Sequence, residues 1–542
     1  MDEYDYVIVG GGSAGCVLAG RLSEDPDVSV LLLEAGSRDW SPAIHFPAGT
    51  VALQNKHWGY LDEPDPSRYD QTMPWMAGKV LGGGSSVNGM VWVRGNPADY
   101  DRWAELGCEG WDYEGVLPYF RRAEDFDQGA TDFRGAGGPQ PVSSKPVAHP
   151  MNSMFIEAAE RAGHPFNPDF NSHDQIGVAW AQTATKRGFR RSEARSYLGP
   201  ARRRRNLTVR TGCFVHRVLF EGTTAVGAEY ERKGRMRQVR GREIIISAGA
   251  LGSPKLLMVS GIGAAEHLRE HGIDVRVDSP HVGRNLQEHP MILMLWNVDV
   301  PTFNVMSVKN IVKSAAAFVI KGEGAAAAGP SHVLLFARTD ERPSPQIEIG
   351  YAALGFAGGD AEVTDERLAG PGTHDVSNMK ILKHPSVMAL VQMVEPTSRG
   401  TVTLSSADPR AHPVITHTLL SEKEDVGNLI AGCKMAREVM LTDPMRSHVL
   451  AEALPGEEVQ TDADWESFVR RAAWGAQHPV GTCKMGTDAE AVVDLELRVI
   501  GAENLRVVDA SVMPEVPSGN TNAPTVMVAE KAADIIRVGR RS

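Results

Sequence analysis

The sequence predicts an α/β protein made of two parts: a parallel sheet assembled from distant segments, and a second, mainly antiparallel sheet with helices packed on it. Three observations predict this. Residues 4–34 have the pattern of strand, glycine turn, helix and strand, and further strands end in glycine-rich or polar segments near residues 247 and 509. Between about residues 296 and 474, alternating apolar residues are typical of antiparallel strands.

The composition indicates a folded protein and excludes several classes of function. The 542 residues are 42% hydrophobic and 23% charged, with a net charge of −12. This acidic balance argues against a nucleic-acid partner. Five scattered cysteines predict neither a disulfide framework nor a metal site. The N-terminus lacks a secretory signal and no apolar run approaches the ~20 residues that span a bilayer, so we expect a cytoplasmic protein without a transmembrane segment.

The opening segment predicts a Rossmann-like dinucleotide site. The apolar run YVIV ends the first strand, Gly10, Gly12 and Gly15 follow as G-x-G-x-x-G, and a helix leads to a second strand that ends at Glu34. Gly10 allows the tight turn, Gly12 lets a pyrophosphate approach the backbone, and Gly15 lets the helix pack on the strand. Glu34 can accept hydrogen bonds from both ribose hydroxyls and would repel the 2′-phosphate of NADP. The pattern leaves FAD and NAD open.

Later segments supply the rest of the expected parallel sheet. The run GKVLGGGSSVNGMVWVRG, from Gly78, leaves a surface without side chains that a flat ring or a phosphate could touch, although a flexible hairpin loop has the same composition. The run SAGALGSPKLLMVSGIG predicts a helix that begins after Ser253-Pro254. Near the end of the chain, LRVVDAS predicts a strand that ends at Asp509, and APTVMVAEKAADIIRVG predicts the last helix.

Together these motifs resemble those of the glucose-methanol-choline (GMC) flavin oxidoreductase family. The resemblance covers nearly the whole chain and also includes GRNLQEHP, HPVGTCKMG and VVDASVMPEVPSGNTNAPT. It implies FAD in a Rossmann-like domain built from noncontiguous segments, an α+β substrate domain with an antiparallel sheet, and oxidation of an alcohol carbon. On this basis we expect FAD-binding segments at 1–155, 205–295 and 475–542, and substrate-domain segments at 156–204 and 296–474.

The resemblance also implies a set of cofactor contacts. At the adenosine end, it assigns the pyrophosphate to Gly10, Gly12, Ser13, Ala14 and Gly15, the ribose to Glu34 and the adenine to the backbone of Val215. The flavin ring and ribityl chain are assigned to Gly82, Gly83, Asn88 and Gly89, with Met90 close by. Asp509 and Ala510 are assigned to the ribityl-phosphate region, and Asn522 to the pyrimidine end of the flavin. Ala35, Gly78, Val91 and Ala248 complete the expected set.

The same comparison implies a catalytic pair. His478 matches the family's catalytic histidine, and Asn520 stands where its partner is His or Asn. Transfer of a hydride from an alcohol requires loss of the hydroxyl proton, and a histidine is largely neutral and basic at physiological pH. The amide can direct the substrate oxygen without competing for the proton. We interpret His289, in the loop-like EHP, as structural.

Two departures from the relatives bear on cofactor and substrate. Val87 stands where some members carry a histidine bonded to the flavin, so we expect noncovalent FAD. His332 stands where choline-oxidising relatives carry a glutamate, and Trp474 precedes the catalytic histidine as a candidate pocket residue. Without an anion in the pocket, we expect a neutral aromatic, allylic or alkyl primary alcohol. The alternative is a choline-type substrate, with another acid such as Glu348 supplying the charge.

Other functions stay open at this stage. A non-redox lyase could keep FAD as a structural group, although the retained base and amide favour redox chemistry. A nicotinamide-dependent dehydrogenase would need a second nucleotide fingerprint, and the sequence contains none that we recognise. The electron acceptor, oxygen or a quinone-like compound, the particular alcohol and the oligomeric state have no sequence signal.

Overall fold

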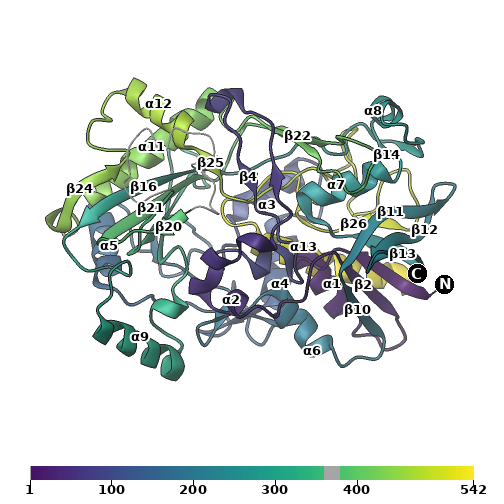
Figure 1. The fold of residues 1–542 in the computed structure, drawn as a ribbon, viewed down its shortest axis with the longest axis horizontal. Helices are drawn as coiled ribbons and strands as arrows, with labels where there is room; N and C mark the ends of the chain where they lie inside the picture. The colour runs from purple at the N-terminus through teal and green to yellow at the C-terminus, as the bar shows by residue number, and fades with distance from the viewer. Residues whose placement is uncertain (1, 359–378, 542) are drawn as a thin grey trace.

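Two seven-stranded sheets lie side by side in the computed structural model, which describes residues 2–358 and 379–541 (Figure 1). The strands of the first sheet come from both ends of the chain and from its middle. In spatial order they are β10 (Leu207–Thr211), β2 (Val30–Glu34), β1 (Glu3–Val9), β13 (Arg235–Ile246), β12 (Thr224–Arg232) and β11 (Cys213–Glu221), with β26 (Leu505–Val507) beside β13. The noncontiguous α/β fold expected from the sequence is therefore confirmed.

The first sheet is parallel at its centre and antiparallel at one edge. Strand β1 pairs in parallel with β2 on one side and with the second half of β13 on the other. The first half of β13 runs antiparallel to β12, which in turn pairs with β11. The central strands are buried on both faces, which explains the uninterrupted apolar runs of β1 and β2.

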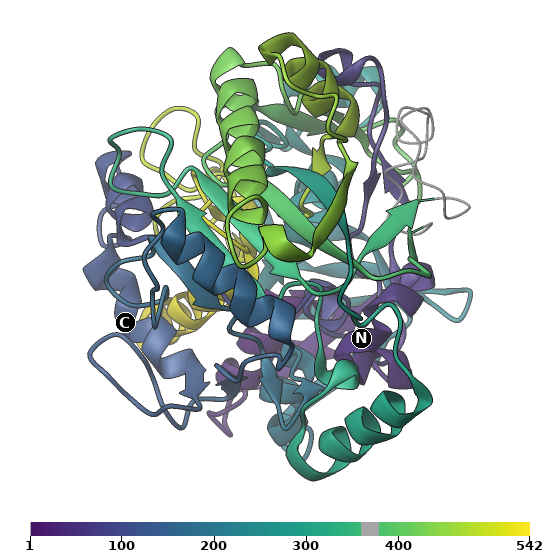
Figure 2. The same ribbon diagram turned by 90° about the vertical axis from the view of Figure 1, so that its left-hand side faces the viewer.

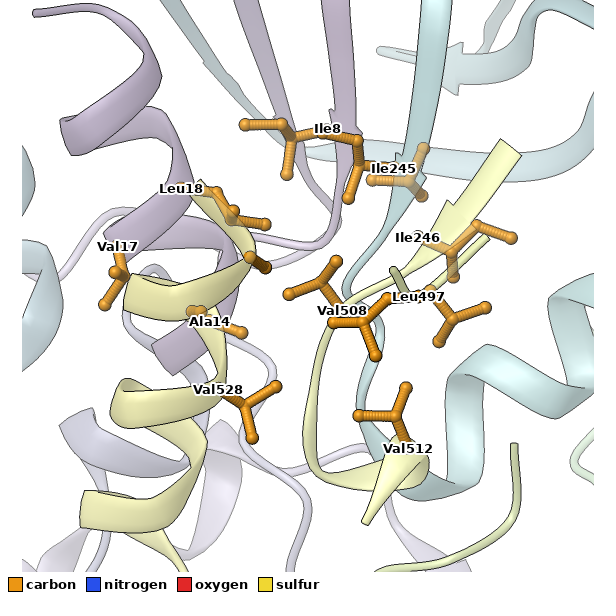
Figure 3. Packing of buried hydrophobic residues seen from close by; sticks show 14 of the residues in the cluster. Ile8, Ala14, Val17, Leu18, Ile245, Ile246, Leu497, Val508, Val512 and Val528 are labelled. Atoms are coloured by element: carbon orange, nitrogen blue, oxygen red, sulfur yellow. The ribbon is translucent and has the colours of Figure 1, made fainter. Parts of the chain in front are cut away.

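Two helices from opposite ends of the chain cover one face of this sheet. Helix α1 (Ser13–Leu22) packs along α13 (Asn522–Arg541). Figure 3 shows Val17 and Leu18 of α1 and Val528 of α13 in one core with Ile8 and Ile245 of the sheet. The dinucleotide-binding unit at the start of the chain is thus completed by the last helix.

Helix α7 (Gly249–Val259) begins earlier than the sequence predicts. The sequence places the helix start after Ser253-Pro254, whereas Pro254 lies inside the observed helix. A proline in this position leaves the carbonyl of Ala250 without its usual backbone donor. The buried hydroxyl of Thr482 donates to that carbonyl at 2.6 Å, so the helix tolerates the proline.

The second sheet is antiparallel, as expected, and separates a helix-covered core from a cavity. Its order is β24 (Val449–Leu454), β16 (Pro290–Val298), β21 (Ser386–Met393), β18 (Ile347–Ala352), β17 (Val333–Ala337) and β7 (Gly177–Trp180), with β25 (Trp474–Gly475) beside β16. Helices α5 (Pro150–Arg161), α11 (Lys423–Met440) and α12 (Asp462–Ala472) pack on one face (Figure 2). Alternate side chains such as Glu348 and Gln392 point to the other face, where they line the cavity.

Some observed elements differ from the expected segments. Strand β22 (Gly400–Thr403), read from GTVTLSS, forms a separate two-stranded sheet with β23 (Val414–His417) and is not part of the large sheet. Strand β16 begins at Pro290, before the expected start of the substrate segment at 296. The domain boundaries themselves stay predictions.

The remaining helices and strand pairs surround the two sheets. The helices are α2 (Pro42–His45), α3 (Pro97–Glu105), α4 (Tyr113–Ala123), α6 (Gly199–Ala201), α8 (Ala265–Glu270) and α9 (Val308–Lys321). The two-stranded pairs are β3 (Tyr60–Leu61) with β4 (Pro74–Trp75), β5 (Glu124–Phe126) with β6 (Gln140–Val142), β8 (Thr185–Lys186) with β9 (Phe189–Arg190), β14 (Ile262–Gly263) with β15 (Val277–Asp278), and β19 (Phe356–Gly358) with β20 (Met379–Ile381).

Candidate active site

A cavity of about 700 Å³ is lined by residues of both sheets. Its lining includes Glu34 of the first sheet and Glu348 of the second. Of the residues predicted to contact the cofactor, the lining contains Gly10, Gly12, Ser13, Ala14, Glu34, Ala35, Gly78, Gly83, Asn88, Gly89, Met90, Val91, Val215, Ala248, Asp509, Ala510 and Asn522. Gly15 and Gly82 are not among the lining residues. Segments far apart in the sequence therefore share one cavity.

The glycine turn after β1 is shaped for a close ligand. Gly10 has a φ of +106°, and a Cβ there would lie 2.2 Å from the backbone oxygen of Ser247. A Cβ on Gly15 would lie 1.9 Å from the oxygen of Gly10, so this glycine serves helix packing, as the sequence predicts. Gly12 has open space around it, lines the cavity and begins α1 without a side-chain cap. The free N–H groups of this helix end fit a pyrophosphate.

Glu34 stands at the end of β2 beside this turn. Its two carboxylate oxygens accept backbone N–H bonds from Gly11 at 2.8 Å and from Gly36 at 2.6 Å. Burial raises the pKa of Glu34 to about 7, although these two bonds act in the opposite direction. The carboxylate is thus held in place at the cavity wall, and its remaining lone pairs can accept hydrogen bonds from a ribose.

Asp509 and Asn522 are held by the protein itself. Asp509 accepts hydrogen bonds from the backbone N–H of Gly249 and the hydroxyl of Ser253, which fixes the first turn of α7. Asn522 accepts a bond from the hydroxyl of Ser13 at 2.8 Å and donates to Glu193 at 3.0 Å. Asn522 therefore bonds to the same turn as the predicted pyrophosphate ligands.

The glycine-rich loop near Gly82 is ordered by a residue that the sequence did not indicate. The loop contains a 3₁₀ turn, Gly83–Ser86, in place of a flexible hairpin. The buried guanidinium of Arg190 donates to the carbonyl of Ser85 at 3.1 Å and to the side-chain oxygen of Asn88 at 2.7 Å. Arg190 lies more than 100 positions away in the sequence, so no local pattern could connect it with this loop.

His478 occupies a strained turn at the cavity wall. The preceding residue, Gln477, has a φ of +70°, which is uncommon outside glycine. The carboxylate of the fully buried Glu288 accepts the backbone N–H of His478 at 2.8 Å and that of His289 at 2.9 Å. Glu288 therefore joins the segment before β16 to the turn that carries His478. Burial raises the pKa of Glu288 to about 8.

The ring of His478 contacts one polar group at each nitrogen. Its Nε2 lies 3.1 Å from the side-chain nitrogen of Asn520. Its Nδ1 lies 3.1 Å from Nδ1 of His289, with the two rings at 81°. Burial lowers the pKa of His478 to about 4, so the imidazole is neutral at physiological pH. The arrangement brings the predicted pair together and adds His289, for which the sequence predicts only a structural role.

A row of side chains crosses the cavity face of the second sheet. Glu348 of β18 is paired with Gln392 of β21, Gln392 with Met291 of β16, and Met291 with Trp474 of β25. All four line the cavity. The buried Nε1 of Trp474 has no hydrogen-bond partner among the described residues. Trp474 thus offers an unused donor, and Glu348 an acid, to a ligand.

His332 does not reach this cavity, contrary to the expectation from the sequence. The ring of His332 is buried, with Nδ1 3.3 Å from the side-chain oxygen of Asn152 on α5 and 3.3 Å from the backbone nitrogen of Ala353. Burial lowers the pKa of His332 to about 3, so it is neutral. The residue precedes β17 and packs toward α5 and Phe303, with ring centroids 5.6 Å apart. Its identity therefore gives no information on substrate charge.

The first sheet presents an uncapped helix end to a glycine-lined cavity, and the turn that follows β25 of the second sheet brings a neutral histidine to the same cavity. These features define a dinucleotide-dependent oxidoreductase. Family models described as GMC oxidoreductase match residues 4–291 and 396–529. The chain belongs to the GMC oxidoreductase family, as its motifs predicted.

Full-length relatives give the same family. The mitochondrial choline dehydrogenase of Mus musculus is 41% identical over 99% of this chain and 90% of its own length. The oxygen-dependent choline dehydrogenase of Sinorhizobium fredii is 40% identical, with 98% and 95% covered. The crystal structure of pyridoxine 4-oxidase from Mesorbium loti is 31% identical and superposes with a TM-score of 0.87 over 99% of both chains.

The chain is therefore an FAD-dependent oxidoreductase that acts on CH–OH groups. The uncapped start of α1 beside Gly12 and the fixed carboxylate of Glu34 fit this cofactor. The described residues bring no three His, Cys, Asp or Glu side chains together as a metal site. None of the helices in residues 2–358 and 379–541 has the length and hydrophobicity that a bilayer crossing requires.

Proposed function

We propose that this enzyme oxidises a primary alcohol that carries a positive charge, such as choline, to the aldehyde. In this proposal His478 accepts the hydroxyl proton, Asn520 orients the substrate oxygen and Glu348 is the counter-charge for the cationic group. When bound, FAD supplies the acceptor for the hydride.

The observation that carries the proposal is the position of Glu348. Its side chain lines the cavity, is 5% exposed and contacts the side-chain nitrogen of Gln392 at 3.4 Å. Burial raises the pKa of Glu348 to about 8. None of the ion pairs among the described residues includes it. A cation placed beside this carboxyl would favour its ionised form and form a buried pair.

The carboxyl also lies near the catalytic groups. Gln392, which contacts Glu348, lies 3.4 Å from Nδ1 of His289, and that ring contacts His478. A Cβ on Gly519, next to Asn520, would lie 3.6 Å from a carboxylate oxygen of Glu348. Choline carries its hydroxyl and its ammonium group on one short carbon chain, which suits a site where the carboxyl of Glu348 lies near His478 and Asn520. The relatives named choline dehydrogenase support the same substrate class.

His478 and Asn520 are suited to remove the proton. The neutral imidazole of His478 has a lone pair at Nε2, and the amide of Asn520 lies beside that atom. An alcohol that enters between them can donate its O–H to His478 while its oxygen accepts a bond from Asn520. The negative charge that develops on the oxygen is then stabilised by a donor already in place.

A neutral alcohol is the second candidate. The apolar side chains of Leu293, Met388 and Leu390 line the same cavity, and contact with an alkyl or aryl group would be worth about 25 cal/mol for each Å² buried. In that case Glu348 would stay protonated at neutral pH and act as a neutral hydrogen-bonding group, which donates its O–H and accepts from Gln392.

Substrate comparison with one isosteric variant separates these candidates. We expect the wild-type enzyme to reduce its flavin with a higher kcat/KM for choline than for hexanol or benzyl alcohol. Glu348→Gln should lower kcat/KM for choline by about 30-fold or more, the order for truncating one partner of a buried charge pair. Turnover of hexanol by the same variant is the control and should change little. Equal losses for both alcohols, or a wild-type preference for hexanol, would contradict the proposal.

A further inference from the structure

Helix α9 carries its apolar side chains on the outside of the molecule. The six residues that form this stripe recur at spacings of three and four along the helix, as on one helical face. They are Val308, Ile311, Val312, Ala315, Val319 and Ile320, and the five larger ones are 53% to 83% exposed. Amphipathic helices normally turn this face toward a core. Here both ribbon views place α9 at the edge of the molecule (Figures 1 and 2).

The helix is attached through a different, narrower face. Phe318 is the buried residue of α9, and its ring contacts the rings of Phe46 and Phe189 at centroid distances of 5.5 and 5.0 Å. The hydroxyl of Ser314 accepts the backbone N–H of Ala325 at 2.8 Å. These contacts hold the helix so that the apolar stripe points away from the body.

The charges on α9 are all positive. Lys309, Lys313 and Lys321 are exposed, and the sequence from Val308 to Lys321 contains no Asp or Glu. The nearest acid in the sequence, Glu323, lies beyond the helix and pairs with Lys145 at 3.8 Å. The whole chain has a net charge of −12, so this local excess of lysine is opposite to the average of the molecule.

We propose that α9 binds the surface of an anionic phospholipid bilayer, with its apolar stripe in the interfacial region and its lysines at the lipid phosphates. An exposed apolar face flanked by lysines is the pattern of helices that lie in a membrane interface. A second copy of the chain fits less well as the occupant, because a two-fold pair of α9 helices would bring the same lysines together.

The segments on either side of α9 form part of the cavity wall, so membrane binding through α9 would bring the cavity close to the bilayer. Phe303 precedes the helix, Ala325 and Ala328 follow it, and all three line the cavity. A bilayer against α9 would therefore lie beside the segments that form part of the cavity wall. Apolar electron acceptors dissolved in the lipid would reach this wall without first entering the bulk solution.

Vesicle co-sedimentation of the full-length, FAD-loaded enzyme tests the proposal. We expect binding to vesicles that contain phosphatidylglycerol, little binding to vesicles of phosphatidylcholine alone, and release at high salt. The double variant Lys309→Gln/Lys313→Gln should bind about 30-fold more weakly, since each lysine near an anionic surface contributes about 1 kcal/mol. Val319→Ser/Ile320→Ser should lower binding by at least about tenfold.

A matched control uses another exposed apolar side chain. Leu450 on β24 is 67% exposed, and Leu450→Ser should bind vesicles like the wild type. All three variants should keep the wild-type flavin content and rate of flavin reduction in solution. The proposal is overturned if the wild type does not bind anionic vesicles, or if the α9 variants bind them as well as the control. It is equally overturned if vesicle binding is absent and the α9 variants convert a dimer into a monomer.

Discussion

Nδ1 of His289 lies 3.1 Å from Nδ1 of His478, so one of these two nitrogens carries the hydrogen between them and the other accepts it. The neighbours decide which one. The side-chain nitrogen of Gln392 lies 3.4 Å from Nδ1 of His289, and that of Asn520 lies 3.1 Å from Nε2 of His478. Both amide nitrogens are donors, which makes these two ring nitrogens acceptors. The hydrogen is therefore on Nδ1 of His478, and its Nε2 presents a lone pair toward Asn520 and the cavity.

The first prediction concerns His289 as a positioning residue. His289→Leu removes the acceptor that holds the hydrogen on Nδ1 of His478, so we expect anaerobic flavin reduction to slow by about 10²-fold, a loss typical of misplaced reacting groups. His289→Asn keeps an acceptor at a similar reach and should recover most of the rate. Stopped-flow absorbance at saturating alcohol measures both, and flavin content serves as the control. Equal losses in the two variants would show that His289 acts only through packing.

The second prediction concerns His478 as the proposed proton acceptor. His478→Ala should lower the rate of flavin reduction by at least about 10²-fold, the order of general-base catalysis, while FAD stays bound. Asn520→Ala should cause a smaller loss, because the base remains and only the direction of the substrate oxygen is lost. Stopped-flow reduction of the purified, yellow variants measures this. A His478→Ala variant with the normal rate would exclude His478 as the base.

The third prediction concerns pH dependence. Burial lowers the pKa of His478 to about 4, so the base is neutral and active at any pH above about 4. Burial raises the pKa of Glu348 to about 8, so its anion predominates only above about 8. For choline, kcat/KM should rise with pH until about 8, whereas for hexanol it should be level above about 4. Glu348→Gln should abolish the upper inflection with choline, and an unchanged profile in this variant would assign the inflection to another group.

The fourth prediction concerns attachment of the flavin. Val87 is buried, lines the cavity and has no nucleophilic atom, so the position offers no bond to the cofactor. Acid precipitation should therefore leave the yellow colour in the supernatant, as measured by absorbance after centrifugation. Colour retained in the pellet would indicate a covalent link through a different residue.

Local patterns in the sequence indicated the glycine turn at the cavity more directly than the residues that the second sheet contributes to it. The spacing of Gly10, Gly12 and Gly15 reflects backbone geometry within one turn, so it can be read without the fold. The row of Glu348, Gln392 and Met291 depends on the pairing of three strands and on which face each residue takes, which local patterns do not specify. For the same reason the sequence position of His332 indicated a substrate residue, while the fold turns its ring toward Asn152.

The order of segments along the chain bears on how the enzyme is made. Synthesis runs from the N-terminus, so the glycine turn and Glu34 are made well before His478, β26 and α13, and α13 covers helix α1. Before β26 and α13 have been made, the edge of β13 that pairs with β26 lacks its partner strand, and the face of α1 that packs on α13 is exposed to solvent. The cavity therefore has its full lining only once Asp509 and Asn522 have been made, and a chain that stops before His478 has neither its proposed proton acceptor nor β26 of the first sheet.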